Sequence, residues 1–316
     1  MRRRRQLQVV SDRTDDIAPG AILAFCCVRN EAARLPHFLD HYRALGVDHF
    51  LFVDNGSDDV TSDLLVDQPD ASLWHADDSY RLARFGMDWL GWLQARFGHG
   101  HWCLTVDADE LLVYPEHDSQ DLRALTGWLD QRDRASFGAM MVELYPRGPI
   151  GDAVYAAGDD PLETLTHFDA DNYRRQWHPV YDNLWIQGGV RDRVFFAEEP
   201  ARAPTLNKTP LVKWHRRYVY VSSTHQLLPR RLHDVFGMTD TPMMTGALLH
   251  TKFLPTIVAK SKEELQRKQH FENTALYRTY HEKLARGPTL WHSPSHRYAG
   301  WRQLVDLGLM SSESWV

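Results

Sequence analysis

An apolar run that stops at two carboxylates is the feature that most constrains this chain. Residues 101–106 are mostly apolar, and Asp107-Ala108-Asp109-Glu110 follows directly. Side chains alternate along a strand, so a strand ending here places Asp107 and Asp109 on one face. Carboxylate oxygens are the ligands that hard divalent cations prefer. The motif therefore predicts a divalent metal site at the end of a strand.

Two further apolar runs end in polar residues in the same way. Residues 21–28 stop at Arg29-Asn30-Glu31, and residues 49–53 stop at Asp54-Asn55-Gly56-Ser57. In an open α/β sheet, ligands bind outside the carboxyl ends of the strands. Three runs with this pattern predict a nucleotide site at one edge of such a sheet.

The spacing of apolar residues predicts alternating strands and helices over the first third of the chain. Helical stripes are expected at about 34–45 and 82–97, with Gly46 as the stop of the first. The predicted strands are 21–28, 49–54, 72–75 and 101–107, and a short helix is expected after the turn at 54–59. This alternation is typical of an α/β fold, with a mostly parallel sheet flanked by helices.

The pattern loosens after Pro115. A helix is expected near 121–131 and a strand at 136–145, whereas 146–210 has weak periodicity and many Pro, Gly, Asp and aromatic residues. We expect this stretch to be loops that shape a pocket, with Trp177, Tyr181 and Trp185 nearby. Short apolar segments follow at 211–221 and 246–250, and helices are expected over 257–283 and near 298–309.

Composition narrows the class of protein. The hydrophobic and charged fractions, 43% and 25%, are those of a globular chain. The net charge of −6 argues against nucleic-acid binding, and no apolar stretch approaches the ~20 residues of a membrane span. Arg2 to Arg5 are not followed by an apolar signal core, which predicts a cytoplasmic protein. These arginines either touch anionic lipid at the inner membrane face or another polyanion, or form a frayed tail. Cys26, Cys27 and Cys103 lie in predicted strands and are expected to be reduced core residues.

The order of these motifs resembles a known family. The block from Phe25 to Asp59, then LTVDADELLVY (104–114), GGVRDRVFF (188–196) and LLHTKFL (248–254), is similar to bacterial family-2-like glycosyltransferases of the GT-A fold. The resemblance is dense over 21–115 and patchy over 186–270. It implies a GT-A-type, Rossmann-like sheet with a loop-rich acceptor region and C-terminal helices. It also implies metal-dependent transfer of a sugar from a nucleoside diphosphate sugar, most commonly UDP-linked, to a saccharide or glycolipid in surface polysaccharide synthesis.

The resemblance divides the chain into three parts. Residues 1–19 are expected to be a flexible basic leader, and 257–316 a C-terminal helical extension. The GT-A-type catalytic domain would span 20–256, with the nucleotide-binding half at 20–115 and the acceptor half at 116–256.

The motifs suggest roles for individual residues. The resemblance implies that Asp107, Asp109 and His250 are the ligands of Mn²⁺ or Mg²⁺. Arg191 and Arg193, one residue apart on an expected extended segment, would share a face and either clamp a diphosphate or an anionic acceptor or belong to a solvated edge strand. The residues expected to bind the donor nucleotide are Arg29, Asn30, Glu31, Asp54, Asn55, Asp107, Arg191, Arg193 and Lys252.

The catalytic base stays open at this point. An inverting transferase needs a group that deprotonates the acceptor hydroxyl, and a retaining enzyme need not have one there. Asp192 and His225 are the candidates, with Asp169 and Asp171 behind them, and no spacing rule chooses among them.

Three other classes share some of these features. A sugar-nucleotide pyrophosphorylase needs a Gly-rich loop after the first strand, and residues 27–36 contain no glycine. A phosphohydrolase with a nucleophilic Asp fits poorly because Glu110-Leu111 follows the two aspartates. A non-catalytic carbohydrate-binding protein would use Trp177, Tyr181 and Trp185 but has no need of the nucleotide half.

Overall fold

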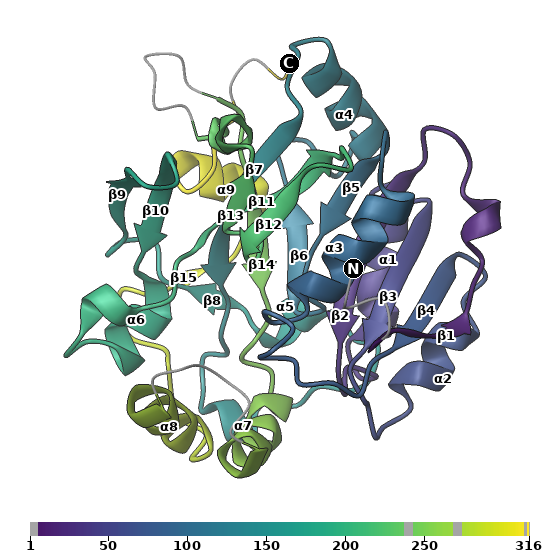
Figure 1. Ribbon diagram of the computed structural model, residues 1–316. Helices are drawn as coiled ribbons and strands as arrows, with labels where there is room; N and C mark the ends of the chain where they lie inside the picture. The colour runs from purple at the N-terminus through teal and green to yellow at the C-terminus, as the bar shows by residue number, and fades with distance from the viewer. Residues whose placement is uncertain (1–5, 237–242, 268–273, 313–314, 316) are drawn as a thin grey trace.

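The computed structural model describes residues 6–236, 243–267, 274–312 and 315 (Figure 1). Within these residues the chain forms a mixed α/β, Rossmann-like fold around one large sheet, so the predicted fold class is confirmed. The sheet has nine described strands. In spatial order they are β1 (Gln8–Ser11), β4 (Ala71–His75), β3 (His49–Asp54), β2 (Ile22–Val28), β5 (Trp102–Thr105), β11 (Asn207–Lys213), β7 (Ser136–Glu143), β14 (Gly246–His250) and β6 (Glu110–Val113).

Most strands of this sheet run in one direction. β4, β3, β2 and β5 are parallel neighbours, and β7 and β14 point the same way because the antiparallel β11 separates β7 from β5. The edge strands β1 and β6 and the internal β11 run opposite. The carboxyl ends of six strands therefore meet at one edge.

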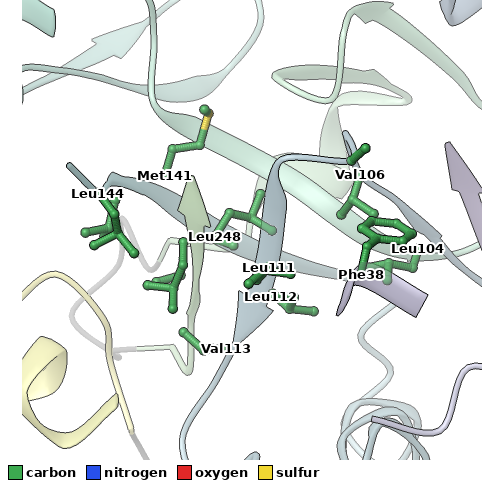
Figure 2. Packing of buried hydrophobic residues seen from close by; sticks show 14 of the residues in the cluster. Phe38, Leu104, Val106, Leu111, Leu112, Val113, Met141, Leu144 and Leu248 are labelled. Atoms are coloured by element: carbon green, nitrogen blue, oxygen red, sulfur yellow. The ribbon is translucent and has the colours of Figure 1, made fainter. Parts of the chain in front are cut away.

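Helices cover both faces of the sheet. The α-helices are α1 (Leu35–Ala44), α2 (Thr61–Val66), α3 (Met87–Phe97), α4 (Leu122–Asp130), α5 (Pro161–Thr164), α6 (Gly189–Phe195), α7 (Thr256–Arg267), α8 (Thr274–Leu284) and α9 (Trp301–Asp306). Alternate residues of β2 enter two separate clusters, since its even-numbered side chains pack with α1 and α4 and its odd-numbered ones with α3. Figure 2 shows part of the first cluster, where Phe38 of α1 lies beside Leu104 and Val106.

The first third of the chain agrees closely with the sequence expectation. The strands at 21–28, 49–54 and 72–75 and the helix at 34–45 are confirmed. Gly46 has φ +91° directly after α1, a left-handed conformation that ends a helix and favours glycine. The helix expected at 82–97 begins only at Met87, because residues 80–86 are turns with positive φ at Arg84, Phe85 and Gly86.

The stretch 146–210 is more regular than expected. It contains β8 (His167–Phe168) and a hairpin of β9 (Arg174–His178) and β10 (Asn183–Gln187), followed by α6. Polar side chains dominate β9, so the strand lacks the apolar alternation by which strands are recognised. A second hairpin, β12 (Val219–Ser222) and β13 (Gln226–Leu228), follows β11, and β15 (His296–Arg297) pairs with β8.

The two ends of the chain join this fold. Residues 8–11, inside the segment expected to be a flexible leader, form β1 and pair antiparallel with β4. Arg2 to Arg5 lie outside the described residues. At the other end, Leu290, Trp301 and Leu304 enter the same core cluster as β7 and β14. No helix among the described residues is long and apolar enough to cross a membrane.

The three cysteines are free thiols. Cys26 and Cys103 are buried as expected, whereas Cys27 is half-buried. Cys26 and Cys27 pack into the two different core clusters, which confirms that they point to opposite faces of β2.

Candidate functional site

Five acidic or imidazole groups meet at the carboxyl edge of the sheet. β7 ends at Glu143 and β14 ends at His250, and these two residues are register partners. β6 begins at Glu110, which pairs with His250 from the other side. Asp107 to Glu110 form the turn between β5 and β6, closed by a 3.0 Å hydrogen bond from the Glu110 amide to the Asp107 carbonyl. The strand expected at 101–107 thus ends two residues early, at Thr105, and a turn rather than strand alternation directs the carboxylates.

Asp109, Glu110 and His250 form a candidate metal centre. One ligand atom from each side chain lies within 4.8 Å of those of the other two. Nε2 of His250 lies 3.2 Å from Oδ2 of Asp109. Two carboxylates and one imidazole are a donor set that suits Mn²⁺ or Mg²⁺. Two of the three expected ligands are thus brought together, and Glu110 joins them.

Asp107 has a different partner. Its Oδ2 lies 3.2 Å from Nζ of Lys208, which also forms an ion pair with Oε1 of Glu110. Lys208 and Glu110 are 3% and 0% exposed. Burial raises the pKa of Glu110, to about 7, against the attraction of Lys208. Burial also opposes the charge of Lys208, but Asp107 and Glu110 hold its pKa above the usual range. Lys208 therefore fixes two adjacent carboxylates and balances part of their charge.

The Asp109–His250 pair is electrostatically coupled. Burial alone would raise the pKa of Asp109, but the charge and hydrogen bond of His250, with Arg34 and Lys252, hold it well below the usual range. Burial opposes the charged form of His250 as well, yet Asp109 and Glu143 raise its pKa. Asp109 is thus an ionised carboxylate whose charge is balanced by His250, Arg34 and Lys252.

Glu143 holds the His250 ring through its other nitrogen, Nδ1. Nδ1 of His250 lies 3.3 Å from Oε1 of Glu143, whose carboxylate is ion-paired with Arg191 of α6. Glu143 and His250 are 2% and 4% exposed. A carboxylate behind a metal-binding imidazole fixes its tautomer and orientation. This contact leaves Nε2 directed at Asp109.

Two cationic side chains lie beside Asp109. Nη1 of Arg34 is 4.0 Å from Oδ2 of Asp109, and the charge of the half-buried Lys252 acts on both Asp109 and Glu143. Thr251 fastens the turn, because its amide and hydroxyl donate to the Asp109 carbonyl at 2.7 and 3.0 Å. The LLHTKFL segment thus contributes three consecutive residues, His250, Thr251 and Lys252, to this edge.

Asp54 is engaged within the protein. It is 1% exposed and accepts hydrogen bonds from the Ser57 amide and hydroxyl, at 3.0 and 2.6 Å, and from the Ser62 hydroxyl at 2.6 Å. The side-chain amide of Asn55 donates to the carbonyls of Ala76 and Asp78. These bonds stabilise the turn after β3, so a direct contact of Asp54 or Asn55 with a ligand stays a prediction.

The segment Arg29-Asn30-Glu31 interlocks with that turn and with α7. Arg29 donates to the carbonyls of Asn55 and Gly56 and forms an ion pair with Glu263. Asn30 and Asp58 exchange two hydrogen bonds, at 2.7 and 2.9 Å. Glu31 binds Lys260 of α7 at 2.6 Å and Arg34 at 2.9 Å. The segment 29–31 and the turn at 54–59 thus form one structural unit.

The expectation for Arg191 and Arg193 was wrong in its geometry. They lie on the helix α6, where side chains two positions apart do not share a face. Arg191 pairs with Glu143, whereas Arg193 makes two hydrogen bonds to Asp169, at 2.8 and 3.0 Å. Gly188-Gly189, read as extended, begins the helix instead.

The two candidate bases differ in their surroundings. Both carboxylate oxygens of Asp192 accept from the guanidinium of Arg174 at 2.8 Å. Nδ1 of His225 donates to the Asn207 carbonyl at 2.7 Å, and its Nε2 has no hydrogen bond to the described residues. Burial and then the charge of Lys208 lower the pKa of His225, to about 3. His225 therefore presents a neutral ring whose Nε2 carries a lone pair.

The aromatic residues expected near the pocket lie on or beside the β9–β10 hairpin. Trp177 pairs with Leu184 and is 40% exposed, whereas Trp185 belongs to the adjacent pair. The two indoles therefore point to opposite faces of the hairpin. The ring of His178 lies 5.1 Å from Tyr181 and 5.5 Å from Trp185.

Sequence reasoning missed three residues of this edge, namely Arg34, Glu110 and Glu143. Glu143 had a readable signal, because it is a carboxylate at the end of an apolar run, as Asp54 is. Glu110 belongs to the quoted motif. Arg34 had no such signal, and neither had the pairing of Lys208 with Asp107 and Glu110, since each cation arrives from a different element of the fold.

Comparison with known proteins adds a fold likeness only. No protein-family model and no curated protein matches the sequence. A solved structure of 4-diphosphocytidyl-2C-methyl-D-erythritol synthase is similar, with 16% identity, a TM-score of 0.27, and coverage of 45% of this chain and 67% of that one. A putative glucose-1-phosphate thymidylyltransferase from Bacillus anthracis has 10% identity, a TM-score of 0.31 and coverage of 84% of both chains. At these values the likeness assigns no activity.

Proposed function

We propose that this chain is a metal-dependent glycosyltransferase that moves a sugar from a nucleoside diphosphate sugar to a saccharide or glycolipid acceptor. The observation that carries the proposal is the convergence of Asp109, Glu110 and His250 at the carboxyl edge of an α/β sheet. Three segments far apart in the sequence supply this edge, in the order that resembles family-2-like glycosyltransferases.

The metal-binding residues in this proposal are Asp109 and His250, completed by Glu110 or Asp107. When bound, Mn²⁺ or Mg²⁺ neutralises the charge that develops on a diphosphate leaving group. Lys208 then keeps Asp107 and Glu110 from repelling that diphosphate.

The nucleotide would lie against the exposed part of this edge. The side chain of Asp107 is 46% exposed, so its second oxygen is available to a ribose hydroxyl. Lys252 and Arg34 place positive charge beside Asp109, where a diphosphate would reach. UDP is the donor nucleotide we expect, by analogy with the resembling family.

Among the candidate bases, we favour His225. Its Nδ1–H bond to Asn207 fixes the tautomer in which Nε2 accepts a proton. The low pKa of the free ring reflects burial and the charge of Lys208. A bound diphosphate beside Lys208 would raise that pKa by adding negative charge, so the base would strengthen when donor is present.

Ligand binding tests the first half of the proposal. Thermal shifts with UDP, GDP, CMP and free sugars, each with and without Mn²⁺, should show stabilisation by one nucleoside diphosphate that disappears with chelator. Stabilisation by sugars alone would favour a carbohydrate-binding protein instead.

Product analysis tests the second half. With the stabilising nucleotide supplied as its sugar conjugates, a glycosyltransferase releases nucleoside diphosphate. A sugar-nucleotide pyrophosphorylase, the alternative reaction, releases pyrophosphate from nucleoside triphosphate and sugar 1-phosphate. No glycine lies in the segment 27–36 after β2, which favours glycosyl transfer. Pyrophosphate release without glycosyl transfer would reverse that preference.

A further inference from the structure

The β12–β13 hairpin exposes an apolar pair on its solvent side. Tyr220 and Leu227 are cross-strand partners and are 3% and 0% exposed. Val219 and Leu228 are the adjacent partners, and each is 38% exposed. Successive pairs face opposite sides of a hairpin. One side is therefore in the core, and the other presents two aliphatic side chains to solvent.

Unpaired arginines flank this apolar pair. Residues 214–231 contain four arginines, two histidines and no acidic residue, in a chain of net charge −6. Arg216, Arg217 and Arg230 are exposed, and none forms an ion pair with a described residue. Because Val219 opens β12 and Leu228 closes β13, the arginines lie at the same end of the hairpin as the apolar pair. We call Arg216, Arg217, Val219, Leu228 and Arg230 the hairpin patch.

Neighbouring aromatic and basic groups extend the hairpin patch. Arg231 donates to the Tyr218 hydroxyl at 2.9 Å and lies over its ring. The rings of His99, which follows α3, and His215 are 4.9 Å apart. Arg96 of α3 stacks on Phe97, and residues 92–100 contain no acidic residue. Positive charge and amphipathic rings therefore surround the exposed aliphatic pair.

We propose that the hairpin patch binds the surface of a bilayer that contains anionic lipids. Arginines without counter-ions attract anionic headgroups, and aliphatic and tyrosine side chains enter the boundary between headgroups and acyl chains. A nucleic acid would satisfy the arginines but would leave Val219 and Leu228 without an apolar partner. The combination therefore favours lipid over other polyanions, and it does so whatever reaction the chain performs.

The hairpin also links this surface to the metal-binding edge. Its closed end carries His225, whose ring feels the charges of Lys208 and Asp107. Its open end carries the hairpin patch, about 10 Å away along β12 at ~3.3 Å per residue. In Figure 1 the hairpin lies across the front of the sheet, next to β11. Bilayer binding would thus hold the site close to the membrane surface.

Co-sedimentation of the full chain with vesicles tests the inference. We expect binding to phosphatidylcholine vesicles that contain phosphatidylglycerol, weaker binding in high salt, and none to phosphatidylcholine alone. The triple change Arg216→Glu/Arg217→Glu/Arg230→Glu should lower the partition coefficient by about tenfold or more. The pair Val219→Ser/Leu228→Ser keeps every charge and should also weaken binding.

Matched variants decide between this surface and its competitors. Charge reversal of the exposed Arg81, Arg286 and Arg297 controls for net charge and should have a smaller effect. Changing Arg2 to Arg5 to serine tests the N-terminal arginines separately. The proposal is overturned if the hairpin variants bind as the parent does, if only the N-terminal variant loses binding, or if the parent binds duplex DNA and not vesicles. Circular dichroism of each variant confirms that the fold is kept.

Discussion

Nδ1 of His250 lies 3.3 Å from Oε1 of Glu143, while Nε2 of the same ring lies 3.2 Å from Oδ2 of Asp109. One imidazole thus joins two carboxylates, and Arg191 closes the chain behind Glu143. Since β7 and β14 are parallel and in register, their last residues are neighbours. The sheet itself thus places the Glu143 carboxylate behind His250, the candidate metal ligand.

Removing the negative charge of Glu143 should weaken metal binding. Glu143→Gln keeps the size of the side chain but loses the charge that orients His250. Such outer partners are worth about 10- to 100-fold in metal affinity. Titration calorimetry with Mn²⁺ measures the loss, and the exposed Glu163→Gln is the control. Unchanged affinity in a folded variant would show that Glu143 serves only Arg191.

Asp109→Asn should abolish metal-dependent nucleotide binding and leave the fold intact. The carboxylate is held ionised by His250 and Arg34, and an amide cannot replace its charge. His250→Ala should likewise lower metal-dependent turnover more than the melting temperature. Binding of nucleoside diphosphate with equal affinity in excess chelator would remove the metal from the proposal. A large loss of stability in His250→Ala with turnover retained would make His250 a core residue.

Lys208→Met should destabilise the protein by about 3 kcal/mol, because it leaves the buried Glu110 without its cation. Urea denaturation measures the change. The double variant Lys208→Met/Glu110→Gln removes both charges and should recover most of the loss without restoring metal binding. Equal destabilisation in the single and double variants would mean that packing around Lys208, and not charge, is responsible.

The sequence predicted the sheet and the edge that carries the candidate site better than the side-chain contacts at that edge. Apolar runs 21–28 and 49–54 were readable because buried parallel strands are continuous hydrophobic segments. Asp109 and His250 were correctly placed together, since both follow such runs. The pairing of Lys208 with Asp107 and Glu110 was not predicted, because Lys208 reaches the edge only through the antiparallel insertion of β11 between β5 and β7. Arg191 and Arg193 were misread because GGVRDRVFF has two glycines at the start of a helix.

A half-buried histidine should make stability fall in mild acid. His41 donates from Nε2 to the Leu112 carbonyl at 3.0 Å, and burial lowers its pKa to about 4 from the usual 6.5. Below pH 6.5 the unfolded chain binds a proton that the folded protein refuses. The stability is therefore complete above pH 6.5 and is lost as pH falls toward 4, by up to about 3 kcal/mol.

Urea denaturation between pH 4 and pH 7 measures this dependence. His41→Gln should flatten the profile in that window, and the exposed His296→Gln should not. An identical slope in parent and His41→Gln would assign the acid sensitivity to other groups.

The segment 146–185 is proposed to form the acceptor side of the site and to become more protected when donor binds. It holds the β9–β10 hairpin and much irregular chain, and Trp177 projects 40% exposed from β9, where it can stack on a sugar ring. Closure over the donor would exclude water, whose attack would hydrolyse the donor in place of transfer. Trp177→Ala or Trp185→Ala should therefore impair acceptor use and spare nucleotide binding. Because the two indoles lie on opposite faces, only one of these variants should show the full effect.

Hydrogen exchange with and without nucleotide and Mn²⁺ measures the ordering of 146–185. Uniformly slow exchange across 146–185 in the free protein would make this segment a rigid part of the fold and would exclude a closing motion.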